Sequence, residues 1–113
     1  MTTPSLKAVN PELVKAAAEM AFPEYSWRSG NVQGAFVFGY KGKEMLTFDL
    51  FRNNSDAHVL MLALMDEKWD FTKSNKRFVA TNRTLKYDLQ KDESFPLLLL
   101  KCVSAMKSIE VYV

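Results

Sequence analysis

The residue types that carry catalysis or bind metals are scarce in this sequence. Its only cysteine is Cys102 and its only histidine is His58. Covalent catalysis needs a nucleophile beside a base, and a structural zinc site needs about four ligands that are mostly cysteine and histidine. Cys102 lies in an apolar run typical of a buried helix, and His58 lies in the first turn of a predicted helix. The sequence therefore predicts no catalytic residue, no metal site and no cofactor, and we expect that the protein is not an enzyme.

The acidic residues and the glycines support the same expectation. Asp66 and Glu67 are adjacent in the sequence, as are Asp92 and Glu93. Because adjacent side chains point to different faces of a helix, neither pair predicts cooperating carboxylates. The glycines match neither a phosphate-binding loop nor a dinucleotide-binding fingerprint.

A basic segment with interleaved aromatic residues is the first candidate for binding. No acidic residue occurs between Phe71 and Tyr87, and the basic residues of this segment are Lys73, Lys76, Arg77, Arg83 and Lys86. With the aromatic rings of Phe71, Phe78 and Tyr87, they could bind phosphates and stack bases. The predicted order of one helix, three strands and a second helix is also that of the double-stranded-RNA-binding domain. The ligand would be a nucleic acid, a nucleotide or an acidic protein surface.

The alternative interpretation of this segment needs no ligand. The aromatic side chains would face the core, and the lysines and arginines would keep a surface hairpin soluble.

A second candidate surface is the segment 25–28, which contains Tyr25, Trp27 and Arg28. Tyrosine, tryptophan and arginine are enriched among the residues that dominate binding energy at protein interfaces. The turn-forming residues that follow could expose this segment. The alternative is that Trp27 packs over the first helix.

A surplus of apolar residues in two predicted helices is the third candidate. Segments 59–65 and 97–100 are apolar nearly all round, which is more than a single core-facing stripe requires. Either both helices pack side by side beneath a sheet, or part of the surplus forms a homodimer or partner interface. Met61 and Met65, which are spaced four residues apart on one helix face, are the predicted interface residues.

The elements that position these residues follow from caps and periodicity. Asn10 and Pro11 predict a helix start, and Pro23 ends that helix. Alternating apolar residues around a turn at 41–43 predict a hairpin, in which Phe36, Phe38 and Tyr40 share a face. The predicted strands are 35–40, 44–51, 69–72, 77–81 and 85–89, with a short terminal strand over 109–113; the later helices are 56–67 and a segment from Pro96 through Met106. This order, α-β-β-α-β-β-β-α-(β), predicts an α+β fold with three helices on a largely antiparallel sheet.

Composition bounds the function class further. The chain has 113 residues, 48% of them hydrophobic and 25% charged, with a net charge of +2. These values predict a single domain over 10–113, preceded by a loose arm over 1–9. The charge is too small for a dedicated nucleic-acid binder and of the wrong sign for an acidic mimic of DNA. The longest apolar run is too short to span a membrane, and the lone cysteine fits a reducing compartment, so we expect a cytoplasmic protein with no membrane contact.

Several segments resemble small proteins of tailed bacteriophages. They are Phe51-Arg52-Asn53-Asn54-Ser55-Asp56-Ala57, Lys68-Trp69-Asp70-Phe71, and the closing helix from Ser94-Phe95-Pro96-Leu97-Leu98 to Cys102-Val103-Ser104-Ala105-Met106. They are similar to the phage α-β-α sandwich proteins, which include relatives of the lambdoid nin-region protein NinX. The resemblance carries over no functional residues, because most members have no known function.

The resemblance implies a phage accessory protein that acts in the cytoplasm of an infected bacterium. The expected function is then to bind a host or anti-phage defence protein and to inhibit or redirect it without catalysis. The alternative is a module that binds nucleic acid or a nucleotide through the basic hairpin 73–87.

Overall fold

The computed structural model describes residues 9–33, 36–74, 77–89 and 94–112. Its helices are α1 (Pro11–Ala21), α2 (Asn54–Asp66) and α3 (Phe95–Lys107). Its strands are β1 (Ser26–Gln33), β2 (Phe36–Lys41), β3 (Glu44–Asp49), β4 (Asp70–Ser74), β5 (Arg77–Thr81) and β6 (Lys86–Asp88). Strands β1, β2 and β3 form the first sheet, and β4, β5 and β6 form the second; all pairings are antiparallel.

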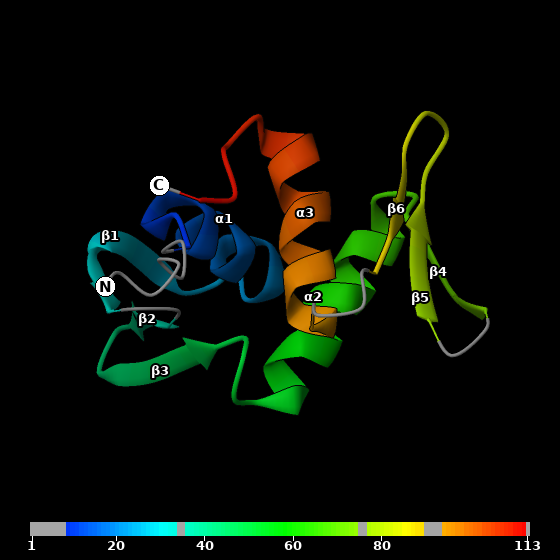
Figure 1. Ribbon diagram of the computed structural model, residues 1–113. Coiled ribbons are helices and arrows are strands. Elements are labelled where there is room, and N and C mark those ends of the chain that lie inside the picture. Colours follow the sequence, from blue (N-terminus) through cyan, green and yellow to red (C-terminus); the bar gives the residue numbers. More distant parts are fainter. Residues whose placement is uncertain (1–8, 34–35, 75–76, 90–93, 113) are drawn as a thin grey trace, which may run out of the picture.

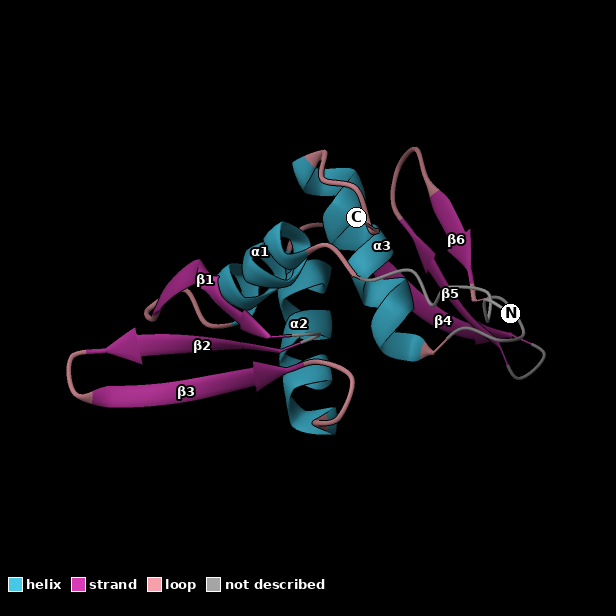
Figure 2. Ribbon diagram, turned by 60° about the vertical axis from the view of Figure 1, so that its left-hand side comes forward, coloured by secondary structure: helices cyan, strands magenta, loops and turns pink. Residues whose placement is uncertain are grey.

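The three helices form the middle layer of the molecule and the two sheets lie on either side of them (Figure 1). Helix α1 packs on β1 and β2, α3 packs on β5 and β6, and each helix contacts the other two. Buried residues of all three helices and both sheets form a single hydrophobic core. The β2–β3 hairpin extends beyond the helices toward its turn, as Figure 2 shows.

Helix α1 lies between the first sheet and the other two helices. The Asn10 side chain accepts a hydrogen bond from the Glu12 backbone N–H at 3.1 Å, and Pro11 occupies the first turn, as predicted. Five of its residues are buried: Leu13, Val14, Ala16, Ala17 and Ala18. Small alanine side chains on several sides let a sheet and two helices approach it closely.

In the first sheet, the inner face is formed by Val37 and Gly39 of β2 and by Phe48 of β3, all buried. Trp27 of β1 lies opposite Gly39, where a Cβ atom would come within 2.6 Å of the indole ring. Glycine at position 39 therefore makes room for the tryptophan. The pairing of β1 with β2 shifts its register between Trp27 and Val32.

In the second sheet, the inner face carries the aromatic residues and packs on α3. The rings of Phe71 and Phe78 lie 6.1 and 4.7 Å from that of Phe95, measured between centroids. Tyr87 stacks on Trp69 with the ring centroids 6.0 Å apart. The indole N–H of Trp69 is buried, and none of the described residues accepts a hydrogen bond from it.

Helix α2 ends in a Schellman motif, in which two backbone N–H groups bond back to the last turn. Lys68 donates to the carbonyl of Met65 at 3.1 Å, and Trp69 donates to that of Leu64 at 3.1 Å. This motif places Lys68 at a φ of 75°, the left-handed region where glycine is usual. A lysine here raises the free energy of the fold by about 1 kcal/mol relative to glycine.

The α+β class and the order of the elements are confirmed. The structure adds β1, because the turn-forming residues 29–31 fall at the register shift inside a strand and do not end it. The strands are divided between two sheets. The three helices lie between these two sheets.

The ends of the described chain lie side by side. The predicted terminal strand is reduced to a bridge between Val9 and Tyr112, supported by a hydrogen bond of 2.9 Å from the Asn10 N–H to the Val111 carbonyl. Val9, the last residue of the predicted arm, is therefore paired. Residues 1–8 lie outside the described residues.

Candidate functional site

Cys102 and His58, the two residues with the most reactive side chains, lie on different helices. Cys102 is fully buried in α3, and burial raises the pKa of its thiol to about 12, so the thiolate is not formed at neutral pH. This confirms Cys102 as a core residue. His58 is exposed on α2. Among the described residues, no group of three or more histidine, cysteine, aspartate or glutamate side chains could hold a metal ion.

The outer face of the first sheet carries an aromatic and apolar surface. Phe36, Phe38 and Tyr40 share this face as predicted, because they alternate with the buried Val37 and Gly39. Tyr40 pairs across the strands with Met45, and the two side chains are 45% and 59% exposed. We call the set Phe36, Phe38, Tyr40, Met45 and Thr47 the aromatic face.

A depression of about 420 Å³ adjoins the aromatic face near the hairpin turn. It is lined by Ser26 and Arg28 of β1, by Tyr40, and by Gly42 in the turn. Arg28 is exposed, as the sequence predicted for this segment. A guanidinium beside an exposed tyrosine ring provides a charged donor and an apolar contact in one place.

Trp27 and Tyr25, the two aromatic neighbours of Arg28, do not join this surface. Trp27 is 5% exposed, and its indole N–H donates to the Phe22 carbonyl at 2.9 Å, so its prediction as a binding residue is wrong. Side chains alternate along β1, and Trp27 therefore faces the core when Arg28 faces outward.

Tyr25 is half-buried, and its hydroxyl donates to Glu44 at 3.1 Å. This hydrogen bond raises the pKa of Tyr25, and the ring packs between Phe22 and Trp27. Its main contacts are therefore internal.

The predicted basic hairpin does not present a single basic patch. Lys73 pairs with Phe78 and its ammonium group lies 5.7 Å from that ring, whereas Arg77 pairs with Ser74 on the opposite face. Lys86 shares the outer face with Arg77, but so do Asp70 and Asp88. Arg83 lies in the turn between β5 and β6. Lys76 lies outside the described residues.

The aromatic residues of that hairpin are not available for base stacking. Phe71, Phe78 and Tyr87 all pack against the core from the inner face of the second sheet. The observed order of α2, three strands and α3 is that of a double-stranded-RNA-binding domain, as predicted. The surface needed for stacking is missing among these residues, so the interpretation in which the aromatic residues face the core is the correct one.

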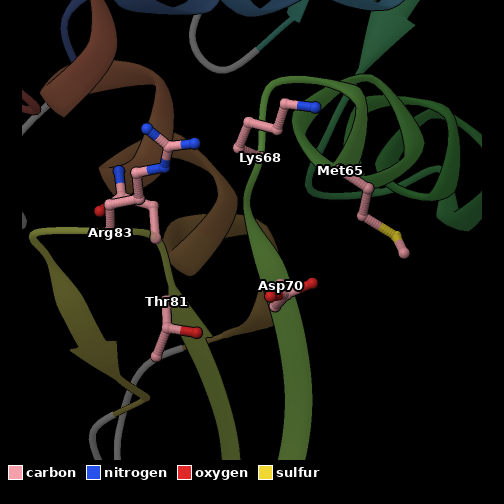
Figure 3. A pocket seen from close by; sticks show the side chains of 6 residues that line it. Met65, Lys68, Asp70, Thr81 and Arg83 are labelled. Atoms are coloured by element: carbon pink, nitrogen blue, oxygen red, sulfur yellow. The ribbon is translucent and has the colours of Figure 1, made fainter.

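A polar cavity of about 420 Å³ opens where α2 meets the second sheet (Figure 3). Lys68 and Arg83 lie at one end of it, Asp70 and Thr81 lie on neighbouring strands, and Met65 lies on α2 (Figure 3). Asn82 completes the lining. An adjoining depression shares Lys68, Asn82 and Arg83 and adds Glu67 and Thr84.

The structure shows which apolar residues of segments 59–65 and 97–100 are buried and which are exposed. In α3, Leu98, Leu99 and Leu100 are buried, so this part of the surplus belongs to the core. In α2, Leu62 and Met65 are 47% and 45% exposed. Met61 packs against the core, so the prediction that Met61 and Met65 form one interface is wrong for Met61.

Sequence reasoning missed the aromatic face and the cavity as binding surfaces. The alternation of Phe36, Phe38 and Tyr40 was visible in the sequence, but it did not say which face of the strand is buried. For Lys68, the signal in the sequence was the absence of a glycine where helix α2 ends. A Schellman motif needs a residue in the left-handed region, and any residue other than glycine is strained there.

Comparisons with known proteins give no relatives for this chain. No protein-family model, no curated protein and no solved structure matches it. Among the described residues, no helix is long and apolar enough to cross a membrane.

Proposed function

We propose that this protein acts without catalysis, by binding a protein partner through the aromatic face of the first sheet. The observation that carries the proposal is the exposed cross-strand pair of Tyr40 and Met45, at 45% and 59% exposure, near the tip of a projecting hairpin. Two large apolar side chains at adjacent positions expose area that folding does not require.

The chemistry of this surface suits a protein partner. Aromatic residues, methionine and arginine are enriched at the centre of protein interfaces, and Arg28 stands beside Tyr40. Helix α1 covers the inner face of the sheet, whereas no described helix or strand packs on the outer face (Figures 1 and 2). A partner that places an acidic side chain opposite Arg28 would gain a charge-assisted hydrogen bond.

The identity of the partner follows from the phage resemblance. A small phage accessory protein would meet its target in the cytoplasm of the infected bacterium. We therefore propose a host or anti-phage defence protein, which binding would inhibit or redirect.

The experiment compares capture by the wild type and by a variant of the aromatic face. The protein and a double variant, Tyr40→Ser with Met45→Ser, are each immobilised and incubated with a bacterial lysate. The matched control is Leu85→Ser, which changes an apolar residue that is 38% exposed in the turn between β5 and β6. We expect a protein that the wild type and the control retain and the double variant loses. Calorimetry with that purified protein should show a loss of affinity of about tenfold or more.

A result that overturns the proposal is equal retention by all three proteins, with circular dichroism confirming that each is folded. The aromatic face would then contribute nothing to binding.

A further inference from the structure

The cavity beside α2, described above, differs in chemistry from the aromatic face. Its charged lining residues are Lys68, Arg83 and Asp70, and Thr81 adds a hydroxyl group. Met65 supplies an apolar wall. A cavity of about 420 Å³ lies in the range of small-molecule sites.

The two cations of this cavity, Lys68 and Arg83, have no ion-pair partner among the described residues. Both are exposed, and both line the cavity and the adjoining depression. Two exposed positive groups in the lining of one cavity favour an oxyanion.

The backbone that carries both cationic residues is held by hydrogen bonds. Lys68 is held in the left-handed conformation by the two hydrogen bonds of the Schellman motif. Arg83 lies in a turn built on Asn82, whose side-chain oxygen accepts from the N–H groups of Thr84 and Leu85 at 2.9 and 2.7 Å. Binding an anion therefore requires little ordering of the backbone.

The lysine at this position is costly for folding, which suggests that its side chain is useful. Glycine would satisfy the same motif without strain. Strained backbone conformations of this kind cluster at ligand sites.

The carboxylates around the cavity limit the anion that fits. Asp70 lines the cavity itself, and Glu67 lines the adjoining depression. A strand of nucleic acid or a triphosphate would bring further negative charge toward one of these groups. A single phosphate between Lys68 and Arg83 avoids both, and Asp70 and Thr81 are then placed to accept hydrogen bonds from hydroxyl groups.

We propose that this cavity binds a phosphate monoester that carries free hydroxyl groups, as in a nucleoside monophosphate or a sugar phosphate. Arg83 and Lys68 hold the phosphate, Asp70 and Thr81 bind the hydroxyl groups, and Met65 contacts the remainder of the ligand. This site is independent of the protein-binding function proposed above.

The first test is a calorimetric titration of the full chain with three probes at low salt. The probes are adenosine 5′-monophosphate, ribose 5-phosphate and adenosine. We expect the two phosphate esters to bind and adenosine not to bind. Tighter binding of the nucleotide than of ribose 5-phosphate identifies a nucleotide site, and equal binding identifies a sugar-phosphate site. Failure of both esters to bind at millimolar concentration, or binding of adenosine as tight as that of its monophosphate, overturns the proposal.

The second test uses the strained backbone at Lys68. Lys68→Gly should raise the melting temperature by about 4 °C, because it removes the strain, and should weaken phosphate binding about tenfold or more. The matched control is Ser108→Gly at the end of α3, where the serine has a φ of 56° and does not line the cavity. It should raise the melting temperature by a similar amount and leave binding unchanged.

A third variant, Arg83→Gln, removes the other cation without altering the turn and should also weaken binding about tenfold or more. Binding of wild-type strength in both Lys68→Gly and Arg83→Gln would overturn the proposal. Weaker binding in Ser108→Gly would do the same, because the loss would then come from the backbone change and not from the lysine.

Discussion

The two sheets differ in which of their faces carry aromatic residues. In the second sheet, Phe71, Phe78 and Tyr87 all point to the helices. Its outer face carries polar and charged residues, which is the usual pattern for an antiparallel sheet with one face in water. In the first sheet, Trp27 and Phe48 fill the inner face, yet the outer face still carries Phe36, Phe38 and Tyr40.

This difference separates residues that folding requires from residues that it does not. The second sheet shows that a three-stranded sheet can be stable in this chain with a polar outer face. The aromatic residues on the outer face of the first sheet therefore call for a separate reason, and binding a partner supplies one.

The largest expected effect distinguishes the two faces of the first sheet. Phe48→Ala should lower the free energy of unfolding by about 3–5 kcal/mol, because the ring is fully buried. Tyr40→Ala, on the outer face, should cost less than about 1 kcal/mol. Denaturation by urea, followed by circular dichroism, measures both. Equal losses would show that the outer face is part of the core, and the assignment of a binding role to it would fail.

The next effect concerns the contact between Trp27 and Gly39. Gly39→Ala should cost about 1–3 kcal/mol, because the new Cβ atom would lie 2.6 Å from the indole ring. Gly42→Ala is the control, since that position has open space around it and a φ of 60°, so only backbone strain of about 1 kcal/mol applies. A smaller loss at Gly39 than at Gly42 would mean that the tryptophan moves aside at little cost.

A smaller effect tests how the first sheet is joined to the helices. The buried carboxylate of Asp56 on α2 accepts a hydrogen bond of 2.8 Å from the Asp49 N–H at the end of β3. Asp56→Ala leaves that N–H without a partner and should cost about 1–2 kcal/mol. Asp56→Asn keeps an acceptor and should cost less.

The difference in stability between Asp56→Asn and the wild type should change with pH in a definite direction. Burial raises the pKa of Asp56 above its usual 3.8, with the nearby charge of Asp49 acting in the same direction and the backbone hydrogen bond opposing it. The folded state therefore binds the proton more tightly than the unfolded state, and this stabilisation is complete below pH 3.8 and is lost as the pH rises through the raised pKa. The stability of Asp56→Asn relative to the wild type should accordingly be higher at pH 7 than at pH 4. The reverse order would show that the folded state prefers the carboxylate.

Features with local causes were predictable from the sequence. The cap formed by Asn10 and the helix start at Pro11 depend on neighbouring residues, and the strand 77–81 has the predicted bounds. The alternation of Phe36, Phe38 and Tyr40 was also read correctly as one face of a strand.

Features with distant causes were not predictable. The burial of Trp27 depends on Gly39 in the neighbouring strand, and segment 25–28 alone left exposure and packing over the first helix both open. The inward direction of Phe78 depends on Phe95 in α3. Lys68 precedes the β4–β5 hairpin in the chain and Arg83 follows it, yet both line one cavity. Spacing along the chain could not show this.

The smallest expected effect concerns Leu62 and Met65, the two exposed large apolar residues of α2. Because they are about half exposed, the double variant Leu62→Gln with Met65→Gln should change the free energy of unfolding by less than about 0.5 kcal/mol. Met61→Gln is the matched control, and its loss should be larger because Met61 packs against the core. Urea denaturation of the three proteins tests this order, and a double variant less stable than Met61→Gln would place Leu62 and Met65 in the core.

The same variants test the homodimer predicted from the sequence, now through Leu62 and Met65. A dimer across a two-fold axis would place this face of α2 against its copy and cover the apolar residues of both chains. Sedimentation velocity at rising protein concentration should then show a dimer in the wild type and a monomer in the double variant. A wild type that stays monomeric at the highest concentration excludes self-association through α2. The aromatic face would then be the larger of the two apolar surfaces still in need of a partner, and the contrast between the two sheets would become sharper.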